Sequence, residues 1–115
     1  MIIKSLIILL TLFTFTKTIY AMEEKEIHSF ISNKYNIAIN LNNDRFQYLL
    51  GSAYLQGSDF QKDITKGLKF LKASADQGND FAYNSLGLLY DFGNEKINID
   101  KEKALYFYKL GVEKG

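Results

Sequence analysis

Residues 50–57 read Leu-Gly-Ser-Ala-Tyr-Leu-Gln-Gly, and residues 86–93 read Leu-Gly-Leu-Leu-Tyr-Asp-Phe-Gly. The two stretches agree at both glycines, the first leucine and the tyrosine, at a constant offset of 36 residues. Residues 63–72 (DITKGLKFLK) then agree with residues 100–109 (DKEKALYFYK) at an offset of 37, because the preceding loop is one residue longer in the second copy. Self-similarity at this period is typical of an array of helical hairpins, which tolerates length changes in its loops.

Each repeat is expected to form two helices. Apolar residues spaced three and four positions apart predict first helices over about residues 44–56 and 80–92, and second helices over about residues 63–77 and 100–114. Short polar residues and glycines mark the ends of these segments. The expected N-caps are Asp44, Asp63, Asp80 and Asp100, and the first helices are expected to stop at Gly57 and Gly93.

The second helices carry apolar residues on two flanks, so each is expected to pack against neighbours on both sides. Phe70 and Phe107 form one flank. The other flank comprises Ile64, Leu68, Leu71 and Ala75 in the first repeat, and Leu105, Tyr108 and Val112 in the second. Gly51 and Gly87 lie inside the first helices, where glycine costs about 1 kcal/mol relative to alanine. We therefore expect the second helix to approach closely there, with room for a neighbour's aromatic side chain.

These residues together resemble the Sel-one-like repeat (SLR), a family related to the tetratricopeptide repeat. The shared pattern is Leu-Gly-x-x-Tyr-x-x-Gly, a short loop, Asp-x-x-Lys-Ala-Leu-x-aromatic and a closing glycine. The resemblance implies an all-α fold, a right-handed α-α solenoid of two SLR helix-turn-helix units, residues 43–78 and 79–115. The residues that carry it are Leu50, Gly51, Tyr54, Gly57, Asp63, Leu68, Phe70 and Gly78, and then Leu86, Gly87, Tyr90, Gly93, Asp100, Ala104, Leu105, Phe107 and Gly115.

The chain also departs from its cysteine-rich secreted relatives, some of which are linked to β-lactam binding or hydrolysis. Those proteins staple each repeat with a disulfide, and this chain has no cysteine. Their activity is therefore not transferred to this chain.

Two segments precede the repeats. Residues 1–21 combine Lys4, an apolar run over residues 5–16 and a small residue, Ala21, at the expected cleavage position. This run is shorter than the roughly 20 residues that a spanning helix needs, so it predicts a secretory signal peptide, with an uncleaved membrane anchor as the alternative. Residues 22–42 carry a helical stripe with Ile27, Phe30 and Ile31, which predicts an N-terminal helical cap or a degenerate repeat.

Charge and composition exclude several classes of site. The chain has 14 basic and 13 acidic residues, so it lacks the cationic excess that nucleic-acid binding needs. It has no cysteine and one histidine, which excludes thiolate and multi-histidine metal sites. No hydrolase, nucleotide-binding or calcium-binding motif occurs, and His28 is interpreted as a partly buried or surface helix residue. We therefore expect no catalytic residue, metal, cofactor or nucleic-acid partner.

The first helices of a solenoid of this kind line its concave side, which is the expected surface for a protein or peptide partner. Phe81 and Leu88 are apolar where solvent would otherwise be expected, so they could hold a peptide or a partner helix; the alternative is contact with the neighbouring first helix. The last repeat has no polar cap, which predicts cover by a second copy, another protein or further sequence. The candidate partner-binding residues are Arg45, Tyr48, Ser52, Gln56, Phe81, Asn84, Leu88 and Asp91.

These observations predict an exported bacterial protein, periplasmic or secreted, that is a non-catalytic protein–protein interaction adaptor. If the signal peptide is cleaved, no stable membrane insertion is expected. Two alternatives remain open. The first is a secreted hydrolase related to the cysteine-rich SLR proteins, which turnover of a β-lactam or a peptidoglycan fragment would reveal. The second is a membrane-tethered envelope factor that keeps residues 1–21.

Overall fold

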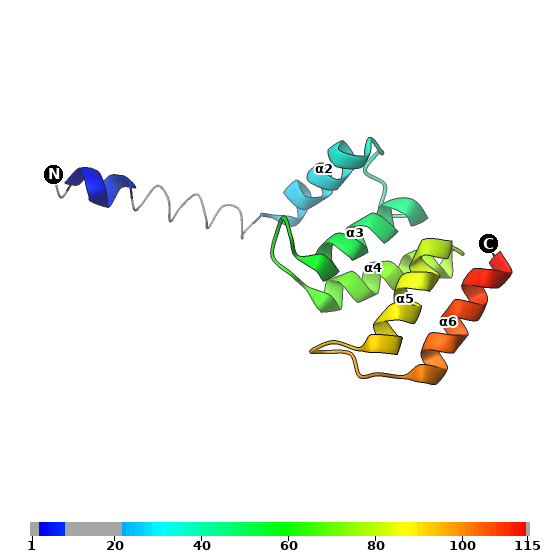
Figure 1. The fold of residues 1–115 in the computed structure, drawn as a ribbon. Helices are drawn as coiled ribbons and strands as arrows, with labels where there is room; N and C mark the ends of the chain where they lie inside the picture. The colour runs from blue at the N-terminus through cyan, green and yellow to red at the C-terminus, as the bar shows by residue number, and fades with distance from the viewer. Residues whose placement is uncertain (1–2, 9–21, 115) are drawn as a thin grey trace.

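The computed structural model describes residues 3–8 and 22–114, and the rest of the expected signal peptide lies outside these ranges. Regular structure within them is helical throughout (Figure 1). None of the helices in this part of the chain is both long and apolar enough to span a bilayer. The helices are residues 3–8, α2 (Glu24–Tyr35), α3 (Asp44–Gln56), α4 (Ile64–Asp76), α5 (Asp80–Phe92) and α6 (Lys101–Lys114).

The N-cap of the first helix in each repeat lies one residue earlier in the sequence than predicted. Asn43 Oδ1 accepts the backbone N–H of the third residue of α3 at 2.9 Å, and Asn79 Oδ1 does the same in α5 at 2.9 Å. The prediction that Asp44 and Asp80 are the N-caps is therefore wrong. Each aspartate is instead the first residue of its helix, where its negative charge faces the positive end of the helix dipole.

The other helix ends are as expected. Asp63 and Asp100 each accept, at 3.0 Å, the backbone N–H three residues ahead, and so cap α4 and α6. Gly57 and Gly93 end α3 and α5 with φ of +61° and +67°. These left-handed values favour glycine because a side chain there clashes with the backbone.

Within each repeat, the two helices pack very closely: α3 against α4, and α5 against α6. A Cβ atom on Gly51 would lie 2.9 Å from the carbonyl oxygen of Gly67 and 3.0 Å from the amide nitrogen of Leu71. A Cβ atom on Gly87 would lie 2.5 Å from Cε1 of Tyr108. The predicted close approach is confirmed in both repeats. The aromatic neighbour is present only in the second, because Leu71 occupies the position of Tyr108 in the first.

The two hairpins repeat the same aromatic packing. Tyr54 stacks on Phe70 with ring centroids 6.0 Å apart and an interplanar angle of 5°. Tyr90 stacks on Phe107 at 5.8 Å and 9°. A lysine from the second helix lies over each tyrosine ring, at 5.6 Å in the first repeat and 5.0 Å in the second. The two units are therefore equivalent in structure as well as in sequence.

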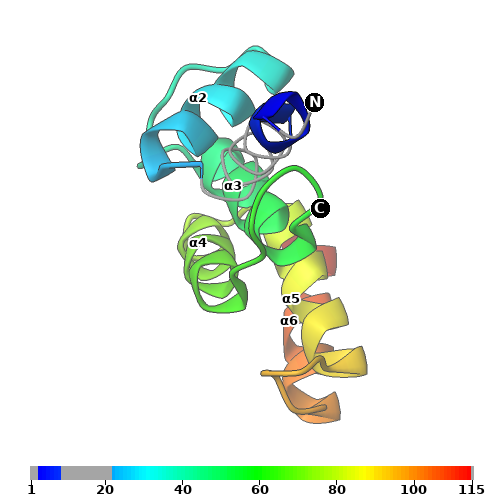
Figure 2. The same cartoon turned by 90° about the vertical axis from the view of Figure 1, so that its left-hand side faces the viewer.

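The hairpins stack side by side as a short helical-repeat solenoid, with α5 packed on α4 (Figure 2). The interface between them is apolar and closely packed. Its buried residues are Leu71, Ala75, Ala82, Tyr83 and Leu86 toward one end, and Ile64, Tyr90, Ile97 and Ala104 toward the loops.

The outer flank of α6 is not a packing surface in this structure. Leu105 and Val112, which were expected on such a surface, are 53% and 81% exposed. Their equivalents in α4 are Leu68, which is half-buried, and Ala75, which is 3% exposed. The difference arises because α5 lies on α4, whereas no described helix lies on the outside of α6.

At the opposite end of the stack, α2 packs on α3. Ile27 and Ile31 are buried together with Phe46 and Leu50. A capping box between the side chains and backbones of Glu23 and Glu26 starts the helix. The α2 helix thus shields the apolar face that α3 would otherwise expose.

Candidate functional site

An open groove crosses the N-terminal ends of α3 and α5. Its volume is about 630 Å³, which is large enough to accept several side chains of a partner. Three helices contribute residues to it: the end of α2, the first half of α3 and the start of α5. The lining residues are Tyr35, Asn43, Asp44, Arg45, Tyr48, Leu49, Asn79 and Phe81.

Aromatic side chains form the apolar part of this groove. Tyr48 and Phe81 pack with their ring centroids 5.5 Å apart and tilted by 32°. Phe81 is 68% exposed and Tyr35 is 40% exposed. Large apolar groups left in water within one depression are typical of a binding site rather than of ordinary surface.

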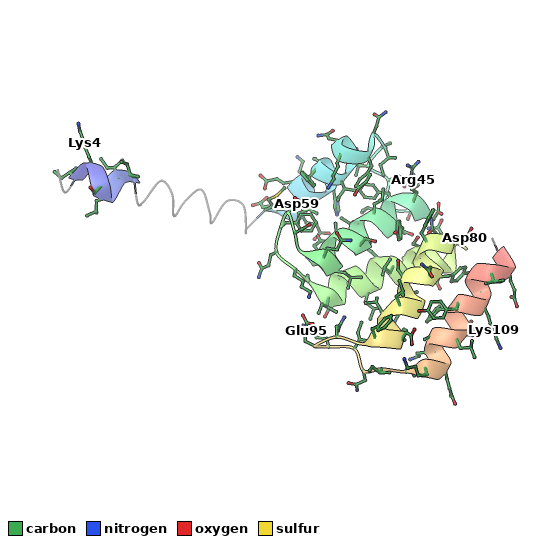
Figure 3. The ribbon with its side chains drawn as sticks, viewed as in Figure 1. Lys4, Arg45, Asp59, Asp80, Glu95 and Lys109 are labelled. Atoms are coloured by element: carbon green, nitrogen blue, oxygen red, sulfur yellow. The ribbon has the colours of Figure 1, made fainter. Side chains whose placement is uncertain are left out.

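The polar residues of the groove are mostly engaged with one another. Asn43 and Asn79 use their carbonyl oxygens as helix caps, and Asn79 Nδ2 donates to Asp44 Oδ2 at 2.8 Å. Arg45 is exposed, and its guanidinium has no partner among the residues that the structure describes. Figure 3 shows Arg45 and Asp80 at the same end of the molecule, away from Asp59 and Glu95.

A second, smaller groove continues along α3. It has a volume of about 130 Å³ and lies between α2, α3 and the loop after α3. It shares Tyr35, Tyr48 and Leu49 with the first groove and extends it toward Ser52 and Gln56. The two grooves therefore form one continuous depression over the exposed face of α3.

The structure separates the eight candidate partner-binding residues into three groups. Arg45, Tyr48 and Phe81 line the large groove, and Ser52 and Gln56 line the small one, together with Tyr48. Asn84 and Leu88 are exposed on α5 outside both grooves. The eighth residue, Asp91, is bonded to α6.

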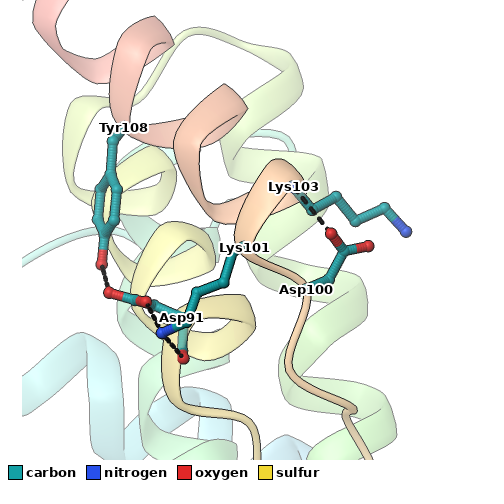
Figure 4. Close-up of polar contacts among 5 residues, drawn as sticks. All are labelled: Asp91, Asp100, Lys101, Lys103 and Tyr108. Carbon is teal, nitrogen blue, oxygen red and sulfur yellow. Dashed lines mark hydrogen bonds and ion pairs between the residues drawn. The ribbon is translucent and has the colours of Figure 1, made fainter.

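Asp91 is held in a polar network between α5 and α6 (Figure 4). Lys101 Nζ donates to Asp91 Oδ1 at 2.5 Å and to its backbone oxygen at 2.9 Å, and Tyr108 Oη donates to Oδ2 at 3.2 Å. The hydrogen bond from Lys101 holds the pKa of the Asp91 carboxyl below its ordinary value. Burial, followed by the hydrogen bond to Asp91, raises the pKa of the Tyr108 phenol. This carboxylate is therefore already satisfied within the hairpin.

Tyr35 and Leu49 line the groove although they were not predicted as partner-binding residues. Tyr35 is the last residue of α2 and belongs to the segment interpreted only as a cap. Leu49 lies between Tyr48 and Leu50, which is the first residue of the Leu-Gly-x-x-Tyr motif. The sequence alone did not mark Tyr35, because the end of α2 at this residue comes from the structure.

A third cavity, of about 250 Å³, lies between the start of α2 and the loop before α4. It is lined partly by Glu24, Tyr54 and Lys66, and Lys66 Nζ lies 3.4 Å from Glu24 Oε2. Tyr54 Oη is buried without a hydrogen-bond partner among the described residues, and burial raises the pKa of this phenol. Two of the charged side chains that line this cavity, Glu24 and Lys66, are therefore paired with each other.

His28 is a partly buried helix residue, as expected. Its side chain is 12% exposed, and Nε2 lies 3.7 Å from Glu24 Oε1. Its ring packs edge-on against Phe46 at 5.9 Å. Within residues 3–8 and 22–114, no group of three or more histidine, cysteine, aspartate or glutamate side chains is placed to hold a metal ion.

Comparison with known proteins identifies the repeats and one structural relative. The model of the Sel1 repeat family matches residues 45–79 and 80–115. The crystal structure of a protective antigen present in uropathogenic Escherichia coli strains, which displays an SLR fold, is similar at 27% identity and a TM-score of 0.65. The similarity covers 83% of this chain but 20% of that one, so this chain spans about a fifth of the antigen's length. No curated protein matches this chain.

Proposed function

The chain belongs to the Sel1 repeat family, and from this premise we propose that it is an exported, non-catalytic adaptor that binds a segment of a partner protein in the groove over α3 and α5. Sel1 repeat proteins generally mediate protein–protein interactions. The observation that carries the assignment to this face is the exposed aromatic lining of the groove, above all Tyr48 packed against Phe81.

The rigidity of the surrounding helices favours such a role. Tyr48 projects from α3 and Phe81 from α5, and both helices are fixed by the buried interfaces of the stack. A preformed site loses little conformational entropy when a partner binds. The exposed aromatic rings also bring a large apolar area and few rotatable bonds, which suits them as binding anchors.

The assignment of a non-catalytic role rests on the chemistry of the described grooves. The carboxylates that line them are engaged, Asp44 by Asn79 and Asp59 by Lys34, with Lys34 Nζ 3.6 Å from Asp59 Oδ2. Among the residues that line the two grooves, no carboxylate is hydrogen-bonded to a hydroxyl group. Turnover of a β-lactam or a peptidoglycan fragment by the purified protein would contradict this part of the proposal.

The export part of the proposal rests on the composition of residues 1–21. N-terminal sequencing of the protein recovered from outside the cytoplasm tests it. A start at Met22 is expected after cleavage at Ala21, whereas retention of Met1 would support a membrane tether.

The adaptor role can be tested by crosslinking in the native cell. A photoreactive benzoyl-phenylalanine at position 81 should give a discrete crosslinked product, since Phe81 lies in the groove. The same residue at position 106 is a matched control, because Tyr106 is a similarly exposed aromatic, 59% against 68%, on α6 outside the groove. Equal products at both positions, or a product at position 106 alone, would show that the groove is not the binding face.

A further inference from the structure

Some polar groups in the groove over α3 and α5 have partners within the protein and one charged group does not, and this difference indicates what kind of segment the groove binds. Asn43 and Asn79 are occupied as caps, and Asp44 Oδ2 accepts from Asn79. Arg45 is the charged lining residue that has no hydrogen-bond or ion-pair partner in the part of the chain that the structure describes, whereas Asp44 is paired with Asn79. A guanidinium offers five N–H donors in a plane and no acceptor. The group that would pair with Arg45 is therefore a hydrogen-bond acceptor supplied by the partner.

The spacing of Arg45 from the aromatic side chains adds a geometric condition. Arg45 and Tyr48 are at positions i and i+3 of α3, which places their Cβ atoms about 5–6 Å apart on one face. In an extended segment, residues i and i+2 point to the same side and lie roughly 7 Å apart. An acidic residue and an apolar residue separated by one position would thus meet Arg45 and the Tyr48–Phe81 pair at the same time.

We infer that this groove recognises an extended partner segment with an acidic residue two positions from a large apolar one. The carboxylate pairs with the Arg45 guanidinium, and the apolar side chain packs against Tyr48 and Phe81. This inference rests on the proposed function, since it specifies the partner of the same groove.

The charge distribution favours a single carboxylate over a polyanion. Arg45 is the one cationic residue that lines the large groove, and Asp44 beside it is acidic. A planar carboxylate can accept two parallel hydrogen bonds from a guanidinium. A nucleic-acid strand would instead need several cations in a row, and the chain as a whole has a net charge of only +1.

Short tryptophan peptides give a direct test with the full chain. The protein has no tryptophan, so the peptide's own emission reports binding. The probes are blocked pentapeptides with Glu-Gly-Trp at their centre, the reverse order Trp-Gly-Glu, and versions with Gln or Lys in place of Glu. One of the two acidic orders should bind about two- to fivefold more tightly than its Gln version, the range expected for an ion pair with an exposed arginine, and the Lys version should bind more weakly still.

Variants assign the effect to the groove. Arg45→Gln should abolish the preference for Glu over Gln but leave binding of the Gln peptide unchanged, whereas Phe81→Ala should weaken all the peptides. Asp44→Asn, which keeps an acceptor for Asn79, should strengthen binding of the acidic peptide. Lys69→Gln removes an exposed cation on α4, outside the groove, and should change nothing. Circular dichroism confirms that each variant is folded.

The outcomes separate this inference from the proposed function. Equal affinity for the Glu and Gln peptides, a preference that survives Arg45→Gln, or no binding of any peptide would each overturn the acidic–apolar specificity. Crosslinking at position 81 but not at position 106 would still support the adaptor role in those cases. A single-stranded oligonucleotide that binds more tightly than the acidic peptides would also overturn the inference.

Discussion

The close approach of α3 and α4 at Gly51 makes the strongest prediction for the fold. In Gly51→Ala, the new Cβ would lie 2.9 Å from the Gly67 carbonyl oxygen, 3.0 Å from the Leu71 amide nitrogen and 3.1 Å from Leu71 Cγ. Two of these atoms belong to the backbone of α4, which cannot rotate away as the end of a side chain can. The helices must therefore move apart by a few tenths of an ångström along their buried contact.

Two opposing terms set the magnitude. Overpacking of a tight core typically costs about 1–3 kcal/mol, and contact with two backbone atoms of α4 places this case in the upper half of that range. Alanine gains about 1 kcal/mol over glycine in a helix. We expect a net loss of about 1–2 kcal/mol in the free energy of unfolding, which lowers the midpoint of thermal unfolding by roughly 4–16 °C in a domain of this size.

A second glycine supplies a matched control within the same fold. A Cβ on Gly111 of α6 would meet Tyr83 Cβ at 3.6 Å, an ordinary van der Waals distance. Gly111→Ala should therefore keep the helix-propensity gain and stabilise the protein by up to about 1 kcal/mol.

Thermal and urea unfolding followed by circular dichroism at 222 nm measure both variants. The expected result is a change of opposite sign for Gly51→Ala and Gly111→Ala. If Gly51→Ala were as stable as the wild type, or if both variants shifted in the same direction, the reasoning from interhelical distance would be refuted.

Three further predictions test the stack, the caps and the polar network. Ala75→Asp should lower the free energy of unfolding by about 3 kcal/mol or more, because it buries an unpaired charge under α5. The repeat-equivalent Val112→Asp, at a site that is 81% exposed, should change the free energy of unfolding by no more than about 0.5 kcal/mol. Urea unfolding of both variants measures the difference. Asn79→Ala should cost about 1–2 kcal/mol as the cap of α5, whereas Asp80→Ala should cost no more than about 0.5 kcal/mol, and the reverse order would contradict the observed cap. The pKa of Asp91 in the folded state is lowered from its ordinary value near 3.8. The stabilisation that the Asp91 carboxylate provides is therefore complete above pH 3.8 and is lost as the pH falls through the lowered pKa. The difference in urea midpoint between wild type and Asp91→Asn should be constant near neutral pH and should disappear in strong acid.

Local patterns explain why so much of the fold could be predicted. Helix periodicity, the Asp63 and Asp100 caps and the left-handed Gly57 and Gly93 all depend on residues within a few positions of one another. The error over Asp44 came from the same local reasoning, since two adjacent residues, Asn43 and Asp44, are both good caps.

The candidate site was predictable only in part, because it depends on contacts between helices. Arg45 and Tyr48 share one face of α3, and their spacing alone places them together. Whether Phe81 joins them depends on how α5 stacks, and the presence of Tyr35 depends on how α2 folds back onto α3.

The sequence by itself determined two equivalent hairpins, because a 36- to 37-residue repeat with matching glycines and aromatic residues imposes the same local folding twice. The tertiary structure decided which of the equivalent positions meet protein and which meet water. Ala75 is buried and Val112 is exposed although they occupy the same place in the repeat, because burial depends on the neighbouring helix. The same physical reason explains why Asp91 bonds to α6 and leaves the groove to Arg45, Tyr48 and Phe81.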